Sequence, residues 1–250
     1  MPDAYMSTPV FVLVRILMAH VLADFVFQPD AWIEDRAKRK AKSPYLYLHI
    51  LIVGLLTWLF IQPRYVFVAP LVIMMTHGAI DIFKTYLPDN TRNFLIDQFA
   101  HILIIVLVWG ALISDLHPFL YTIKLIAFPS LWIVLLSYII AIWPASFVIA
   151  KFTQKWREDI DQADDYDISG LEDAGKWIGR IERFLILTLI LINQYSAIGF
   201  LIASKSIFRF SGIEKKQVRK EAEYILIGTL ISFALAIILG LATKYLLNAI

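Results

Sequence analysis

Residues 126–150 read IAFPSLWIVLLSYIIAIWPASFVIA and contain no Asp, Glu, Lys, Arg or His. A helix needs about 20 consecutive, predominantly apolar residues to cross the hydrocarbon core of a bilayer. This stretch meets that requirement, so we expect it to cross a membrane as an α-helix.

The composition of the whole chain supports the same interpretation. Of its 250 residues, 59% are hydrophobic and 18% are charged, and the mean hydropathy is +0.69. Water-soluble domains usually have about 45–50% apolar and about 25% charged residues. The chain has no cysteine, which excludes disulfides and thiolate metal sites. The N-terminus lacks the pattern of a cleaved signal peptide, so we interpret the first apolar stretch as a retained span.

Further apolar stretches predict an all-α, polytopic transmembrane helical bundle. Residues 177–210 are too long for one comfortable span and contain a polar break at Asn193–Ser196, which predicts two short helices. This gives about eight spans, and the alternative of one long tilted helix gives seven. The other expected spans are 10–28, 45–62, 65–87, 94–113, 126–150 and 222–247.

The distribution of basic residues favours eight spans. With the N-terminus outside, all but four of the 23 basic residues fall on the cytoplasmic side, as the positive-inside rule requires. Seven spans would place the basic segment 214–220 outside. We therefore predict a multi-pass protein of the bacterial inner (cytoplasmic) membrane. Residues 1–118 would form one half, and residues 119–250 a second half with an acidic cytoplasmic loop at 151–176. The four exceptions are Arg15, Arg64, Lys124 and Lys244.

Histidine and aspartate recur four residues apart in the first half. Residues with this spacing share one face of a helix. Odd-numbered spans run inward and even-numbered spans return, so all of these groups should meet at the cytoplasmic end of the bundle. The groups are the pairs His20/Asp24, His77/Asp81 and Asp97/His101, together with His49.

Such a cluster indicates a metal-binding or reactive site, because ionisable groups in a bilayer are costly unless they are paired, hydrated or bound to a metal. Imidazole and carboxylate are ordinary ligands of Zn²⁺, Mn²⁺ or Fe²⁺, and this many groups could hold one or two ions. A metal would acidify bound water and supply a nucleophile. A proton or ion pathway and a purely structural network are the alternatives. The predicted ligands or proton carriers are His20, Asp24, His49, His77, Asp81, Asp97 and His101.

Catalytic and anion-binding roles are also predicted. We expect Asp24, Asp81 and Lys84 to be catalytic, and Lys84 and Gln98 to bind an anionic or carbonyl oxygen of a substrate.

A separate cationic face is predicted in the second half of the chain. Lys205 and Arg209 lie four residues apart and could bind a phosphate or lipid head group. The alternative is that they snorkel to the membrane surface and pair with Glu182 and Glu223.

The motifs resemble a bacterial integral-membrane family of unknown function, numbered 3307. The resemblance rests on A-H-x-x-x-D-F-x-x-Q (Ala19 to Gln28), H-x-x-x-D-x-x-K (His77 to Lys84) and D-Q-x-x-H (Asp97 to His101). It continues through the segments 174–183, 205–210 and 223–233, and so covers nearly the whole chain. The family implies the architecture but no reaction. The segment 16–101 is also loosely similar to membrane-bound metal-dependent hydrolases.

Three functions follow as hypotheses. The first is a metal-dependent hydrolase at the cytoplasmic membrane face, acting on a phosphate-bearing or lipid-linked substrate in contact with membrane lipid. The second is a transporter or channel for divalent cations or protons. The third is a non-catalytic scaffold or sensor that recruits a cytosolic protein partner through 151–176 or 211–221. The basic loops suit anionic lipid at least as well as nucleic acid, so no nucleic-acid partner is predicted.

Overall fold

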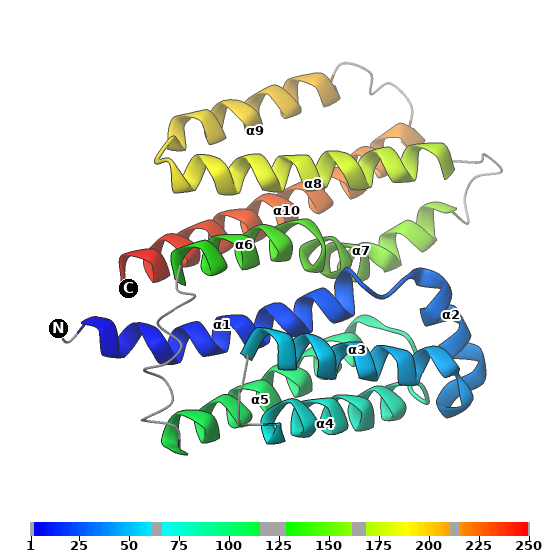
Figure 1. Ribbon diagram of the computed structural model, residues 1–250. Helices are drawn as coiled ribbons and strands as arrows, with labels where there is room; N and C mark the ends of the chain where they lie inside the picture. Colours follow the sequence, from blue (N-terminus) through cyan, green and yellow to red (C-terminus); the bar gives the residue numbers. More distant parts are fainter. Residues whose placement is uncertain (1–2, 62–66, 116–128, 162–168, 211–215, 250) are drawn as a thin grey trace. The chain divides into compact units, whose positions relative to one another are not determined.

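The structure is a computed structural model that describes the backbone of residues 3–61, 67–115, 129–161, 169–210 and 216–249. Within these ranges, side chains are described for residues 9–61, 67–113, 129–157, 175–205 and 223–249. All the regular elements in the described ranges are helices (Figure 1). The chain divides into two compact units, Met1–Leu136 with Ala249–Ile250, and Ser137–Asn248. The boundary expected after residue 118 falls on residues outside the description.

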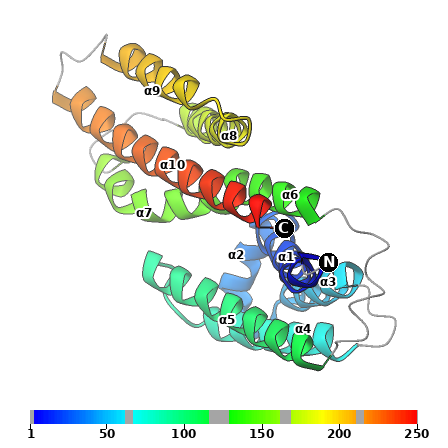
Figure 2. The same ribbon diagram turned by 90° about the vertical axis from the view of Figure 1, so that its left-hand side faces the viewer.

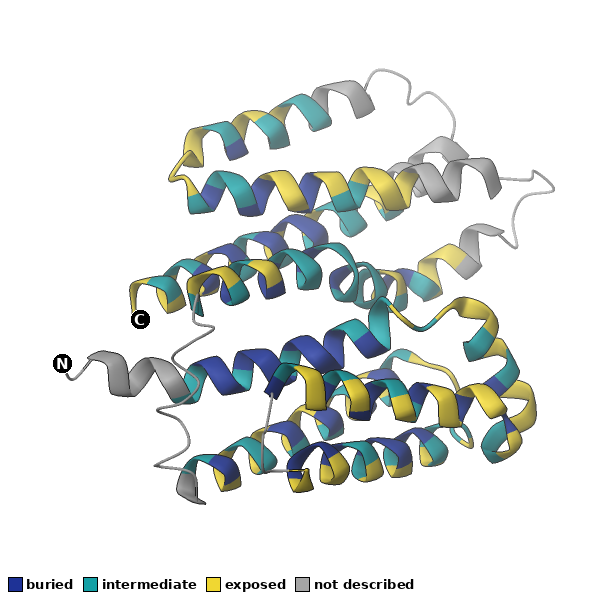
Figure 3. Cartoon of the chain, viewed as in Figure 1, coloured by how far each residue is buried: buried dark blue, intermediate teal, exposed yellow. Residues whose placement is uncertain are grey.

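The first unit is built on a four-helix bundle. α1 (Asp3–Phe25) packs against α3 (Pro44–Ile61) and α5 (Thr91–Asp115), and α4 (Val68–Lys84) packs against the same two helices (Figures 1 and 2). The core between them contains Ile16, Val53, Ile73 and Ile105, each at most 3% exposed. The outer faces of α3, α4 and α5 are rich in exposed residues (Figure 3). These faces carry large apolar side chains such as Leu51 and Leu55, as expected for helices that face lipid.

A short helix that the hydropathy pattern does not predict follows α1. α2 (Asp30–Arg39) and the 3₁₀ turn η1 (Lys40–Lys42) lie where the sequence predicts a loop. The break Val26–Pro29 bends the chain by 76° between α1 and the α2–η1 segment. Trp32 stacks on Tyr45 at the start of α3, with ring centroids 5.4 Å apart, so α2 is anchored to the end of the bundle.

The second unit contains α7 (Pro144–Asp161), α8 (Ser169–Leu191), α9 (Tyr195–Phe210) and α10 (Lys216–Asn248). α6 (Pro129–Ile142) crosses the boundary between the units. α10 packs against α7 and α8, and α8 packs against α9. The predicted break between α8 and α9 is confirmed. Asn193 adopts φ 63, and the amide of Gln194 donates to the carbonyl of Leu189 at 2.7 Å, as at many helix C-termini.

Four helical stretches of the described chain are long and apolar enough to cross a membrane: Pro44–Ile61, Thr91–Ile113, Pro129–Arg157 and Glu223–Asn248. The bent pair Pro9–Phe25 and Asp30–Lys42 makes five if it forms one span. The chain therefore has the helices of a membrane protein, with fewer spans by length and composition than the eight predicted. α4 and α9 have only 17 and 16 residues, and α8 carries Lys176, Arg180, Glu182 and Arg183.

The packing of α10 on α8 depends on Gly240. A Cβ atom there would lie 2.6 Å from Cδ1 and 3.1 Å from Cβ of Ile190. Overpacking costs about 1–3 kcal/mol, which exceeds the gain in helix propensity of at most about 1 kcal/mol. We expect Gly240→Ala to lower the unfolding temperature in detergent, measured by circular dichroism. Gly199→Ala on α9 is the control, because no atom lies within 4 Å of its added Cβ. Equal unfolding temperatures for the two variants would contradict this account.

Candidate metal centre

All four helices of the first bundle contribute to one buried histidine–aspartate cluster. Its side chains lie toward the end of the bundle at which α1 and α4 end and α3 and α5 begin. Each of the seven side chains is at most 10% exposed. The members are His20 and Asp24 from α1, His49 from α3, His77 and Asp81 from α4, and Asp97 and His101 from α5.

Two carboxylate oxygens of the cluster lie close to the same pair of imidazole nitrogens. His49 Nε2 and His77 Nε2 lie 3.0 Å apart. Asp24 Oδ1 lies 3.5 and 3.4 Å from these two nitrogens, and Asp81 Oδ2 lies 3.3 and 3.7 Å from them. Four ligands bound at about 2.0–2.2 Å around a tetrahedral Zn²⁺ are about 3.3–3.6 Å from one another. These five distances match or approach those between the ligands of a tetrahedral metal site.

Asp24 is the member whose charge is least compensated. Its Oδ1 atom is buried and accepts no hydrogen bond, although three imidazole nitrogens lie within 3.6 Å of it. No Lys or Arg side chain of the described residues forms an ion pair with it. A buried carboxylate in this state is costly unless a proton or a cation is bound. Asp24 Oδ1 is therefore suited to be a metal ligand.

His20 and His101 extend the cluster on one side. Their rings stack with centroids 5.3 Å apart, and the ring of His77 lies 4.1 Å from that of His101. Both ring nitrogens of His20 and Nε2 of His101 are buried without a hydrogen-bond partner. Three overlapping triads could each hold an ion: His20/Asp24/His77, His49/His77/Asp81 and Asp81/Asp97/His101.

Arg36 is a cluster residue that the sequence analysis did not identify. It is 8% exposed, and its Nη1 atom donates to Asp81 Oδ2 at 3.0 Å. In the sequence, Arg36 is only one of the many basic residues expected on the cytoplasmic side. The bend between α1 and α2 turns this one guanidinium inward, while its neighbours Lys38 and Arg39 are exposed.

Asp97 is held by the residues that the sequence predicts to bind an anion. Lys84 Nζ lies 2.5 Å from Asp97 Oδ2, and Gln98 Nε2 donates to the same oxygen at 3.1 Å. The Lys84 side chain is 40% exposed, so it lies at the rim of the cluster and neutralises Asp97.

Lys205 lies in the second unit, where it forms an ion pair with Glu182 at 2.5 Å. The side chain of Arg209 lies outside the described residues. Arg183, which is 2% exposed, donates from Nε to the carbonyl of Ala141 at 2.5 Å. It also donates from Nη1 to Ser232 at 3.0 Å. Its charge therefore meets the C-terminal end of α6, where the helix dipole is negative.

The fold and the cluster define an α-helical protein with membrane-type helices and a buried candidate metal centre in its N-terminal bundle. The family described as "Protein of unknown function (DUF3307)" matches residues 12–127, so the N-terminal part of the chain is similar to that family. The matched segment contains all seven histidines and aspartates of the cluster. None of the curated proteins and none of the solved structures matches the chain.

The Arg36–Asp81 ion pair generates a stability prediction. Removing one partner of a buried ion pair costs about 3–5 kcal/mol, because the other charge stays buried without compensation. We expect Arg36→Gln and Asp81→Asn each to lower the unfolding temperature of protein treated with a chelator. The double variant should recover most of the loss. Additive losses in the double variant would show that the two side chains are not coupled.

Proposed function

We propose that the histidine–aspartate cluster holds a divalent metal ion, and that the protein is a metal-dependent hydrolase. Its substrate would be phosphate-bearing or lipid-linked and would be cleaved at the cytoplasmic membrane face. The observation that carries the proposal is that Asp24 Oδ1 and Asp81 Oδ2 each lie 3.3 to 3.7 Å from both His49 Nε2 and His77 Nε2, which are themselves 3.0 Å apart. Two imidazoles and two carboxylates suit Zn²⁺, Mn²⁺ or Fe²⁺.

The remaining cluster residues fit the other tasks of hydrolysis. A divalent ion would acidify bound water and polarise the bond to be cleaved. The unpartnered nitrogens of His20 and His101 can accept and return a proton. Asp97 would support a second ion through its triad with Asp81 and His101. Lys84 at the rim can leave Asp97 to pair with an anionic group of the substrate.

Eight spans in the bacterial inner membrane remain part of the proposal. The separate helices α8 and α9 support it, because a chain that turns back at Asn193 would make two crossings where one long helix would make one. α4 and α9 are short, but flanking basic and aromatic side chains can extend a short span by snorkelling to the interface.

Transport of a divalent cation or proton is the second candidate, because broken helices support it. Transporters bind ions where transmembrane helices are interrupted. Here the chain bends by 76° between α1 and α2, close to the cluster. α6 and α7 are separated at Trp143, beside Pro144.

Metal content tests the proposal most directly. We expect the protein purified without chelator to hold one or two equivalents of a transition metal by elemental mass spectrometry. His77→Ala should lose most of it, because His77 belongs to two of the three triads. Gln98→Ala is the matched control, because Gln98 contacts the cluster only through Asp97. A wild-type protein without metal, even after incubation with Zn²⁺, Mn²⁺ and Fe²⁺, would overturn the metal centre.

Turnover separates the two candidate functions. A hydrolase should cleave a phosphoester such as p-nitrophenyl phosphate or a phospholipid in detergent, where no gradient exists. His77→Ala should lower the rate at least 100-fold. Uptake of the metal into proteoliposomes, with no cleavage of either substrate in detergent, would instead establish transport.

The absence of cysteine makes the topology directly measurable. Eight spans predict that Asn193→Cys reacts with a membrane-impermeant maleimide on intact spheroplasts, and that Lys42→Cys and Lys216→Cys react only after lysis. Labelling of Lys216→Cys on intact spheroplasts would support seven spans.

A further inference from the structure

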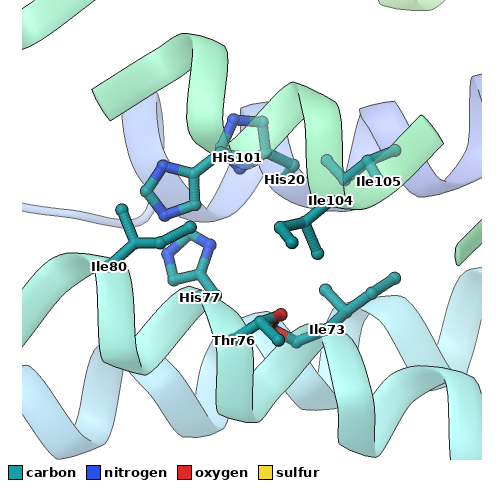
Figure 4. A pocket seen from close by; sticks show the side chains of 8 residues that line it. All are labelled: His20, Ile73, Thr76, His77, Ile80, His101, Ile104 and Ile105. Carbon is teal, nitrogen blue, oxygen red and sulfur yellow. Dashed lines mark hydrogen bonds between the residues drawn. The ribbon is translucent and has the colours of Figure 1, made fainter. Parts of the chain in front are cut away.

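A small cavity lies against the histidines of the cluster, between α4 and α5 with α1 behind them (Figure 4). Its volume is about 10 Å³, roughly the least that admits one water molecule. Three imidazoles form its polar end, those of His20, His77 and His101. The rest of the lining is Thr76 and four isoleucines, Ile73, Ile80, Ile104 and Ile105.

The cavity becomes apolar in one direction along both helices. α4 and α5 are joined by a short connection and pack against each other, so they run antiparallel. From Asp81 to Ile73 on α4, and from Asp97 to Ile105 on α5, is eight residues, or about 12 Å of helix. Asp81 and Asp97 therefore lie at one end of the interface between α4 and α5, and Ile73 and Ile105 lie toward the middle of the bundle. A lipid in one leaflet has the same order, with its polar head at the interface and its chain toward the midplane.

The exposed surfaces of α4 and α5 are suited to contact lipid chains. Met75 on α4 is 63% exposed, and Leu103 on α5 is 45% exposed. The Thr76 hydroxyl donates to the carbonyl of Val72 at 2.7 Å. Its hydrogen-bond donor is therefore satisfied within α4. When α4 and α5 span the membrane, acyl chains are what contacts this surface. The histidines at the inner end are nearly inaccessible, since His20, His77 and His101 are each at most 4% exposed.

We propose that the substrate is a membrane lipid whose hydrocarbon chain lies between α4 and α5, with the bond to be cleaved at the histidine–aspartate cluster. This inference rests on the proposed hydrolase function and names its substrate class. The chain would occupy the cavity and lie along Ile73 and Ile105. Ile80 and Ile104 must rotate to admit it, because the cavity alone has room for only one water-sized group. The head group would lie beside Lys84 at the rim.

Photo-crosslinking in nanodiscs tests this arrangement. The probe is phosphatidylglycerol with a diazirine in the middle of one acyl chain, and adducts are mapped by peptide mass spectrometry. Ile73 and Ile105 are 3% and 2% exposed, so lipids that only surround the protein cannot reach them. We expect adducts on both residues in the wild type. Adducts confined to outward residues such as Met75 and Leu103 would overturn the proposal.

Matched variants sharpen the result. Ile104→Trp fills the cavity from α5 and should lower the labelling of Ile73 at least fivefold. Ile80→Trp should do the same from the α4 wall. Leu103→Trp adds the same side chain one residue away on the lipid-facing surface and should leave the labelling of Ile73 unchanged. Equal labelling of Ile73 in all of these variants would contradict a chain in the cavity.

Metal content and phospholipid cleavage in the same preparations separate this inference from the function on which it rests. Bound metal without adducts on Ile73 and Ile105 would overturn the lipid position and leave the metal centre standing. Adducts on both residues without metal or cleavage would overturn the hydrolase and support only a lipid-binding cavity.

Discussion

The N-terminal bundle depends on how it compensates carboxylates that are buried among apolar helices. Asp81 is neutralised by Arg36 and Asp97 by Lys84, so each has a cation from another part of the chain. Asp24 has only imidazoles around its Oδ1 atom. Because an isolated charge is very costly in such an environment, the helices must stay in the arrangement that brings His20, His49 and His77 to this oxygen.

The second unit places a buried charge by a different physical means. Arg183 has no carboxylate within ion-pair distance in the described part of the chain, and it donates to backbone carbonyls at the end of α6 and to hydroxyl groups. Pro144, which follows the break at Trp143, has no N–H group with which to continue the hydrogen-bond ladder. The guanidinium thus stabilises an interrupted helix, and its N–H groups have hydrogen-bond acceptors. The cluster of the first unit instead retains unpartnered atoms, which is why it is the candidate for chemistry.

Much of this arrangement follows from the four-residue spacing of the histidines and aspartates and from the alternating direction of successive helices. Pairs such as His77 and Asp81 must share a helix face, and antiparallel spans bring late positions of one helix beside early positions of the next. The structure brings all seven predicted groups together in this way. The two helices within 177–210 were predicted from the polar break at Asn193–Ser196. Residues 30–42, in contrast, have no apolar periodicity that separates a short helix from a basic loop.

The contacts that hydropathy could not predict depend on tertiary geometry. Arg36 is one of several basic residues in its segment, and only the bend after Phe25 selects it to contact Asp81. Lys84 and Gln98 were expected to face a substrate, but nothing in their spacing shows that Asp97 is within reach. Hydropathy predicts 126–150 as one span, and the structure keeps Pro129–Arg157 as one membrane-length stretch, but hydropathy does not predict the interruption of the helix at Trp143. α4 and α9, with 17 and 16 residues, are shorter than a standard span of about 20 residues, which hydropathy alone does not show.

The contribution of four helices to one cluster has a consequence for biogenesis. α1 leaves the ribosome with His20 and Asp24 long before α3, α4 and α5 exist. His20 and Asp24 lie in the last two turns of α1, and ionisable side chains within a membrane-spanning helix are costly until they are paired. We therefore expect α1 to be fully stable only once later helices supply their imidazoles, and α5 is the last of them. Integration of the N-terminal half is thus expected to be a concerted event, in which helices made early wait at the membrane surface or beside the translocon for those made later.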